Sequence, residues 1–406
     1  MFFARFAAAA LAGTLLMAGV PTASAQYSDG VIKIGVLSNQ SAVGSDASGV
    51  AAATAARLAV EDVGAAINGV PVEVIDEDFG EKPDLAAQIA RRWYDTEKVD
   101  AIADMPVSSA ALAVQDVARN AKKTLLVGGA VTANLTGAAC SSYGTHWTDN
   151  SRALTSAVVQ GVTKAPGETW FFMAVDYALG ASLQRDATAA IAREGGKVVG
   201  GVRYPLGAPD LASFLLQAQA SGAHFIGLAS IGKDTINAIK EAREFHLQES
   251  GQQLAAFLVF ITDIHGLGLE AAQGLNVASG FYWDQNDEMR KFAQRLYAKH
   301  QRMPTKEQAA VYVSVRHYLK AVAAAGTDEA LTVNRKMREL PVDYFGETGS
   351  IRPDGRVLYD LTLYKVKSPA ESKKPWDYYE PVRVIAKETA FGPAEESGCK
   401  PERLER

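Results

Sequence analysis

Hydroxyl side chains gather where two predicted strands of this chain end. The stretch ADMPVSSAAL (103–112) follows a strand predicted at 99–104 and begins a helix predicted over 108–121. One serine, Ser108 or Ser109, is expected to cap this helix, an interaction worth about 1 kcal/mol. The other serine, together with the free N–H groups of the first helical turn, suits a ligand carboxylate. The pattern therefore predicts an anion site built from hydroxyls and main-chain amides.

The loop GGAVTANLT (128–136) repeats this arrangement after the next predicted strand, 123–129. Its glycines allow a ligand to approach the backbone closely, and Thr132 supplies a hydroxyl. In open parallel sheets, ligands bind beyond the carboxyl ends of the strands. Both loops are therefore expected to face one site.

Acidic and imidazole groups follow other predicted strands. The polar loop SNQSAVGSDASG (38–49), which contains Asp46, is expected to form one wall of a cleft. In ITDIHGLG (261–268), Asp263 and His265 could face the cleft as hydrogen-bonding or charged partners of a ligand. Asp263 could equally cap the helix that follows, so both interpretations stay open.

Aromatic residues lie at strand ends and predicted domain crossings. Tyr177 directly follows the strand predicted at 169–176, whereas Trp147 and Trp283 lie at the first two predicted crossings between domains. A single aromatic residue at such a position usually packs in a core. Three of them could sandwich a ring or a branched aliphatic group of a ligand.

Several other chemistries are disfavoured by the motifs. GLASIGKD (227–234) matches the phosphate-loop pattern except at Asp234, which would place a negative charge beside the phosphates, so a strand-to-helix turn is predicted. No G-x-S-x-G elbow occurs, and the six histidines lack paired metal-ligand spacing. His246, His300 and His317 are expected at the surface. Neither a metal nor a cofactor is expected, and an enzyme is not favoured.

Strands and helices alternate twice along the chain. The first series has predicted strands at 31–37, 71–78, 99–104 and 123–129 and helices at 47–67, 84–95 and 108–121. The second has strands at 169–176, 197–205, 223–229 and 254–261 and helices at 178–196, 210–222 and 234–245. This alternation predicts an α/β fold with two Rossmann-like, doubly wound parallel-sheet domains joined by a multi-segment hinge.

The remaining chain is predicted to return to the first domain. Helices at 286–300 and 305–325 precede a β-rich stretch at 350–367, so crossings are expected near 147, 278 and 350. Lobe 1 is predicted to comprise 26–147 and 278–350, and lobe 2 to comprise 148–277 and 351–367. Residues 368–406 are predicted to form a surface extension.

The first 25 residues read as a secretory signal peptide cleaved near Ala25, with a positive start, an apolar run and a small-residue site. No later stretch approaches the roughly 18 apolar residues of a spanning helix, so a soluble exported protein is expected.

A net charge of −5 and the absence of basic runs argue against a nucleic-acid partner. Export permits a disulfide between Cys140 and Cys399, with two unpaired buried thiols as the alternative.

The order of these segments resembles a known family, the type I periplasmic solute-binding proteins of ABC importers, in the leucine/isoleucine/valine-binding branch. The resemblance covers essentially the whole mature chain and lies in IKIGVLSNQSAVGSDASG, VDAIADMPVSSAAL, LLVGGAVTANLTG, VDYALGASL, DLASFLLQAQASGAHFIGLA and LVFITDIHGLG. It implies that the ligand carboxylate is held at Ser108, Ser109, Ala130 and Thr132. It also implies that Tyr177 closes over the ligand.

The chain departs from the amino-acid binders of this family at two places. Those proteins use a glutamate after the fourth strand of the second domain, where ITDIHG offers the shorter Asp263, and a tyrosine where this chain has SIGKD. The segments ACSSYGTHWTDN, SFLLQAQAS, FITDIHGLGL, RMPT, IRPDGR and PWDYYE resemble a subgroup linked to uptake of benzoates and hydroxycinnamates. That subgroup also looks to pair a mid-chain and a C-terminal cysteine.

The resemblance implies a monomeric periplasmic binding protein that closes on a small apolar or aromatic carboxylate. Its partner would be an inner-membrane ABC permease, to which it delivers the carboxylate. A branched-chain or other hydrophobic amino acid is the alternative ligand. An exported hydrolase is the remote alternative.

Overall fold

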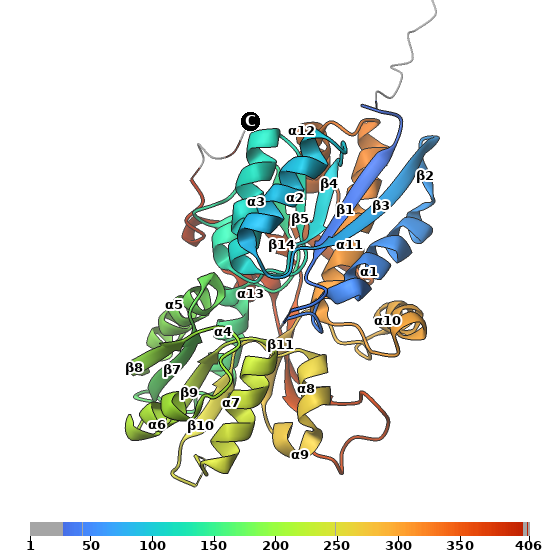
Figure 1. The fold of residues 1–406 in the computed structure, drawn as a ribbon. Coiled ribbons are helices and arrows are strands. Elements are labelled where there is room, and N and C mark those ends of the chain that lie inside the picture. The colour runs from blue at the N-terminus through green and yellow to red at the C-terminus, as the bar shows by residue number, and fades with distance from the viewer. Residues whose placement is uncertain (1–26, 43, 248, 401–403, 405–406) are drawn as a thin grey trace, which may run out of the picture.

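A computed structural model describes residues 27–42, 44–247, 249–400 and 404. The predicted signal peptide, residues 1–25, lies outside the described residues. Figure 1 shows two α/β lobes, one above the other, with the chain passing several times between them. None of the described helices is both long and apolar enough to cross a membrane.

The sheet of lobe 1 has the strand order β2-β3-β1-β4-β5-β6, and every neighbouring pair except β2 and β3 is parallel. Its strands are β1 (Ile32–Ser38), β2 (Ala66–Ile67), β3 (Val70–Asp78), β4 (Ala101–Asp104), β5 (Thr124–Val127) and β6 (Gly144–His146). The central strands β1, β4 and β5 are almost entirely buried and mostly apolar, as expected for strands covered by helices on both faces. Gly35 in β1 leaves room for the Trp93 ring, since a Cβ there would approach that ring to 2.4 Å.

Helices and a small antiparallel sheet complete lobe 1. They are α1 (Gly49–Val63), α2 (Pro83–Asp95), α3 (Ser108–Ala121), α10 (Asp287–His300), α11 (Lys306–Ala325), α12 (Ala330–Glu339), β12 (Val342–Tyr344), β13 (Glu347–Ile351) and β14 (Val357–Leu358). The apolar helix α11 packs against α1 and β4. At Gly128 a Cβ would come within 2.8 Å of Val311, so the loop after β5 lies directly against α11.

Lobe 2 contains a parallel sheet of order β10-β9-β7-β8. It also contains an antiparallel sheet of order β11-β15-β16, whose strands come from separate parts of the sequence. The strands are β7 (Thr169–Val175), β8 (Lys197–Tyr204), β9 (Phe225–Ala229), β10 (Gln253–Ala256), β11 (Asn276–Ser279), β15 (Leu361–Val366) and β16 (Tyr379–Ile385). The helices of lobe 2 are α4 (Ser151–Val162), α5 (Ala178–Arg193), α6 (Ala212–Ala220), α7 (Gly232–Glu244), α8 (Ile261–Leu267), α9 (Leu269–Ala272) and α13 (Lys387–Phe391). Two short 3₁₀ turns lie elsewhere: η1 (Ala133–Thr136) in lobe 1 and η2 (Ala394–Glu396) near the C-terminus.

The predicted α/β class with parallel-sheet domains is confirmed. Cys140 and Cys399 form a disulfide with a Cα–Cα distance of 5.6 Å. The turn predicted at GLASIGKD is also confirmed, because α7 begins at Gly232 and Asp234 lies in its first turn.

Four details differ from the sequence prediction. The fourth strand of lobe 2 ends at Ala256, and α8 begins at Ile261. β14 pairs with β13, so the third crossing follows Leu358 rather than lying near 350. Within the predicted surface extension, Tyr379–Ile385 forms β16 against β15, where Pro381 and a register shift obscured the strand pattern. His317, predicted at the surface, is buried and hydrogen-bonds the Met337 carbonyl, because the α11 face that carries it packs against α12.

The three crossings meet at one buried carboxylate. Asp149, on the first crossing, accepts hydrogen bonds from the Gly280 amide at 3.2 Å on the second and from the Tyr359 hydroxyl at 2.9 Å on the third. Lys306 Nζ lies 3.2 Å from the same carboxylate. Gly280 is required here because a Cβ would come within 2.2 Å of the Tyr359 ring. These contacts tie the crossings into a single hinge.

Candidate functional site

The carboxyl end of β4 is conformationally strained. Asp104 and Met105 both have positive φ, 80° and 60°, although neither is glycine. Such backbone persists only where its surroundings hold it, and it clusters at functional sites. Asp104 is buried and accepts a hydrogen bond from the Ser48 hydroxyl. Burial raises the pKa of Asp104 to about 7, despite the opposing effect of that bond.

The start of α3 differs from the predicted capped helix. The expectation that Ser108 or Ser109 caps α3 is wrong, since Val107 occupies the N-cap position and no side chain caps the first turn. Ser108 is instead the first helical residue. Its hydroxyl is fully buried and has no hydrogen-bond partner among the described residues, and Ser109 beside it is half-buried. The strained turn at Asp104 and Met105 redirects the chain so that the helix begins one turn after the strand.

The loop after β5 contacts the opposite lobe. The Thr132 hydroxyl accepts a hydrogen bond from the Asn134 amide at the start of η1, and it lies 2.7 Å from the Ser182 hydroxyl of α5. The Ala130 amide donates to the Met105 carbonyl at 2.9 Å, so the two predicted anion loops are bonded to each other. Thr132 therefore lies at the boundary between the lobes.

Tyr177 bridges the lobes as the N-cap residue of α5. It packs against two hydrophobic clusters, one of which consists of lobe 1 residues. Burial raises the pKa of its hydroxyl, and the acidic groups of Glu81, Glu307 and Asp234 act in the same direction. Because Glu81 and Glu307 belong to lobe 1 and Asp234 to lobe 2, the hydroxyl lies among acids from both sides.

The polar side chains of ITDIHG, Asp263 and His265, have different surroundings. Asp263 caps α8 by accepting a 2.9 Å hydrogen bond from the Phe260 amide, and burial raises its pKa to about 7. His265 is exposed, stacks on Trp376 at 4.1 Å between ring centroids and contacts the Tyr378 hydroxyl at 2.7 Å. The structure thus places His265 against the C-terminal loop that carries Trp376 and Tyr378.

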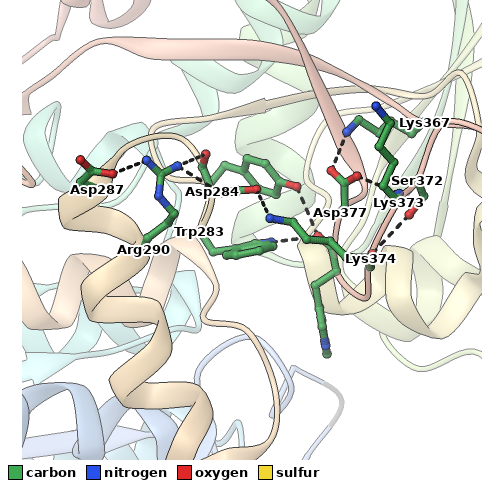
Figure 2. Close-up of polar contacts among 11 residues, drawn as sticks. Trp283, Asp284, Asp287, Arg290, Lys367, Ser372, Lys373, Lys374 and Asp377 are labelled. Atoms are coloured by element: carbon green, nitrogen blue, oxygen red, sulfur yellow. Dashed lines mark hydrogen bonds and ion pairs between the residues drawn. The ribbon is translucent and has the colours of Figure 1, made fainter.

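The two tryptophans of the predicted aromatic group each have contacts within the protein. Trp147 is fully buried, donates to the Thr145 hydroxyl at 2.8 Å and packs near His317. Trp283 donates to the Trp376 carbonyl at 2.8 Å, and Lys374 lies 4.8 Å from its ring centroid. Figure 2 shows Lys374 beside Trp283, joined to Asp284 in a 2.8 Å ion pair. Both tryptophans therefore have structural partners of their own.

Asp46 lies on the exposed part of its loop and forms an ion pair with Arg302. The Asp46 charge still contributes to the raised pKa of Asp263, which places this loop of lobe 1 opposite α8 of lobe 2. Asp46 is thus at the rim of the boundary between the lobes.

Sequence reasoning missed the buried charges at the start of α11. Glu307 is 1% exposed, and Lys306 is 4% exposed with its ammonium near Asp149 and 5.7 Å from the Phe260 ring centroid. In RMPTKEQAA these residues resemble an ordinary solvated helix start. The signal that was available is the Thr305–Gln308 capping box, which fixes the start of α11 at this point. The described residues contain no group of three or more His, Cys, Asp and Glu side chains that could hold a metal ion.

Comparisons with known proteins assign the class. A sequence profile described as periplasmic binding protein matches residues 31–374. No curated protein matches the chain significantly. The chain belongs to the periplasmic binding protein family. Similar proteins of solved structure are solute-binding components of ABC transporters. Membership implies a periplasmic location and work alongside a membrane permease.

Solved structures agree with this class. A periplasmic binding protein from Burkholderia mallei is 42% identical, with a TM-score of 0.89 over 91% of this chain and 98% of that one. A branched chain amino acid ABC transporter periplasmic ligand-binding protein from Burkholderia xenovorans is 37% identical, with a TM-score of 0.81 over 91% and 99%. An ABC transporter solute binding protein from Rhodopseudomonas palustris in complex with p-hydroxybenzoic acid shares the fold at 20% identity, with a TM-score of 0.78 over 90% and 100%.

Proposed function

We propose that this protein captures a small carboxylate with an apolar or aromatic body, of the benzoate or hydroxycinnamate type, and delivers it to an ABC permease. The carboxylate is received at the start of α3 by Ser108, Ser109 and the first-turn amides, with Ala130 and Thr132 on the neighbouring loop. Tyr177 covers the ligand from lobe 2. One observation carries the proposal: the Ser108 hydroxyl is buried at the start of α3, and no described residue bonds this hydroxyl or caps the helix with its side chain.

A closing motion follows from this arrangement. A ligand can shift the open and closed forms only through contacts that differ between them. Thr132 of lobe 1 and Ser182 of lobe 2 already meet at 2.7 Å, so a ligand bound beside Thr132 contacts both lobes when they close. The bound solute is then presented to the permease by a closed protein.

A hydrophobic amino acid is the second candidate ligand, favoured by the similarity to the Burkholderia xenovorans protein. Calorimetry with 4-hydroxybenzoate, coumarate and leucine separates the two candidates. The aromatic acids should give a binding signal, whereas a signal from leucine alone would replace the aromatic ligand by an amino acid. Turnover of ester or amide substrates that is lost on replacing Ser109 would favour the remote hydrolase alternative.

The proposed anion contacts are tested by the double variant Ser109→Ala with Thr132→Val. Hydrogen bonds to a charged group are worth roughly 1.5–3 kcal/mol each, so the affinity for the acid should fall at least about tenfold while the protein stays folded. The control is Ser213→Ala with Thr188→Val, which removes exposed hydroxyls of lobe 2 and should leave affinity unchanged. Unchanged affinity in the first variant would place the anion elsewhere.

A further inference from the structure

Glu307 lies where four elements converge. It is the second residue of α11, and its pKa is raised well above the usual range, first by burial and then by the charges of Asp104 and Asp263. The same glutamate acts on the Tyr177 hydroxyl. The start of α11 lies near the end of β4, since Gln308 and Asp104 are both hydrogen-bonded to Ser48. It also lies near the start of α8, since Lys306 Nζ is 5.7 Å from the Phe260 ring centroid. The effect on Tyr177 links it to the start of α5, so the surrounding elements come from both lobes.

The polar atoms at this point lack protein partners. Both carboxyl oxygens of Glu307, one carboxyl oxygen of Asp104 and the Ser108 hydroxyl are buried with no hydrogen-bond partner among the described residues. Buried polar atoms are almost always paired, and leaving one unpaired is destabilising. Unpaired atoms on three neighbouring elements point to a ligand more than to a packing defect.

The position of these groups is fixed by the surrounding contacts. Thr305 donates from its hydroxyl to the Ala47 carbonyl at 2.5 Å, and Gln308 donates to the Ser48 carbonyl at 2.9 Å. The Ser48 hydroxyl in turn bonds Asp104. The capping box of α11 thus holds Glu307 and Asp104 through one short loop, so their unpaired oxygens are preorganised.

The nearby Lys306 ammonium partly offsets the raised pKa of Glu307, but among the described residues it is hydrogen-bonded to other groups. Lys306 is bound to Asp149 at 3.2 Å and to the Ala278 carbonyl at 3.4 Å. Glu307 and Asp104 can therefore accept a donor supplied by a ligand.

We propose that Glu307 and Asp104 accept a hydrogen bond from a donor group of the ligand, a hydroxyl or an amino group, and so select carboxylates that carry a second polar group. This inference rests on the proposed function, because it assumes that the ligand lies between the start of α3 and Tyr177. It narrows the ligand class from apolar carboxylates to hydroxy or amino carboxylates.

Two matched ligand pairs test the inference by calorimetry. 4-Hydroxybenzoate and leucine carry a donor, whereas 4-methoxybenzoate and 4-methylpentanoate are their donor-free counterparts. For the pair that binds, the donor-bearing acid should bind about tenfold more tightly or better. Binding of the hydroxybenzoate pair identifies a hydroxyl as the donor, and binding of the leucine pair identifies an ammonium.

The variant Glu307→Met, which removes both acceptor oxygens, should reduce that preference to less than about threefold and leave the donor-free acid nearly unaffected. Glu339→Met, which changes an exposed carboxyl of lobe 1, is the control and should keep the preference. Equal binding of donor-bearing and donor-free acids to the wild-type protein would overturn this inference while leaving the proposed function intact. If no acid of either pair binds, the proposed function fails and this inference fails with it.

Discussion

At the scale of single residues, Asp104 combines a strained backbone with a buried carboxyl. Its φ of 80° places it in a conformation that an ordinary side chain adopts at a cost of order 1–3 kcal/mol. Its carboxyl has one hydrogen bond, to Ser48, and one oxygen without a partner among the described residues. Both features reduce stability, which is consistent with a position kept for ligand binding.

The raised pKa of Asp104 predicts a pH-dependent effect of Asp104→Asn. The folded-state value of about 7 lies above the unfolded value of about 3.9, so the folded protein binds the extra proton between these pH values. The free energy of unfolding of the wild type therefore loses this contribution as pH rises through 7. Relative to the wild type, the free energy of unfolding of the Asn variant should rise by about 3 kcal/mol between pH 5 and pH 8, since two of these pH units lie below the folded-state pKa and each corresponds to about 1.4 kcal/mol.

Urea unfolding at pH 5, 6, 7 and 8 measures this difference. Asp116→Asn, which changes an exposed carboxyl paired with Arg119, provides the control and should follow the wild type. Parallel pH curves for the wild type and Asp104→Asn would mean that Asp104 is ionised or solvated throughout this range, contrary to the prediction.

At the scale of elements, the disulfide attaches the C-terminal segment to lobe 1. Cys140 and Cys399 are separated by 259 residues, and the Arg152–Glu396 ion pair adds a second attachment nearby. In the chain-entropy account, a loop of this length contributes on the order of 5 kcal/mol by restricting the unfolded chain. The segment therefore matters more for stability than its exposed position indicates.

Reduction of the disulfide should accordingly destabilise the wild type by up to about 5 kcal/mol in guanidinium unfolding. The double variant Cys140→Ser with Cys399→Ser should already have that lower stability and should not respond to reducing agent. A wild type whose unfolding midpoint is the same with and without reductant would contradict the entropic contribution.

The elements differed in how well the sequence predicted them. Buried parallel strands such as β1 and β7 were predicted because most of their residues are apolar. β16 was not, since Pro381 interrupts it and its side chains are mostly exposed. The uncapped start of α3 could not be foreseen, because a hydroxyl near a helix start is normally a cap and only the backbone turn at Met105 excludes that role here.

The candidate site was predictable only in part, for a related reason. Thr132 and Tyr177 follow strands, and the rule for parallel sheets brings such residues to one boundary. Glu307 follows no strand, and its burial depends on α11 returning from lobe 2 to pack on β4. Long-range packing of this kind is not encoded in local periodicity. The contact of His265 with Tyr378, 113 residues further on, is long-range in the same way and is not encoded in the local pattern either.

At the scale of the whole molecule, hinge and closure contacts are separate. The hinge is the group around Asp149, where all three crossings are hydrogen-bonded. The closure contacts join η1 of lobe 1 to α5 of lobe 2, through Thr132 with Ser182 at 2.7 Å and through Arg185 with Asn134 at 3.0 Å. Changes at the second group should therefore alter how far the lobes close without disrupting the hinge.

The double variant Ser182→Ala with Arg185→Ala should shift the ligand-free protein toward an open form. Polar contacts of this kind are worth about 1 kcal/mol each, so their loss changes the ratio of closed to open molecules by roughly tenfold or more. Small-angle X-ray scattering should then show a larger radius of gyration than for the wild type, and saturating ligand should return it to the closed value. Ser213→Ala, on an exposed face of α6, is the control. A radius of gyration that stays at the wild-type value without ligand would mean that the hydrophobic packing around Tyr177, rather than these hydrogen bonds, determines closure.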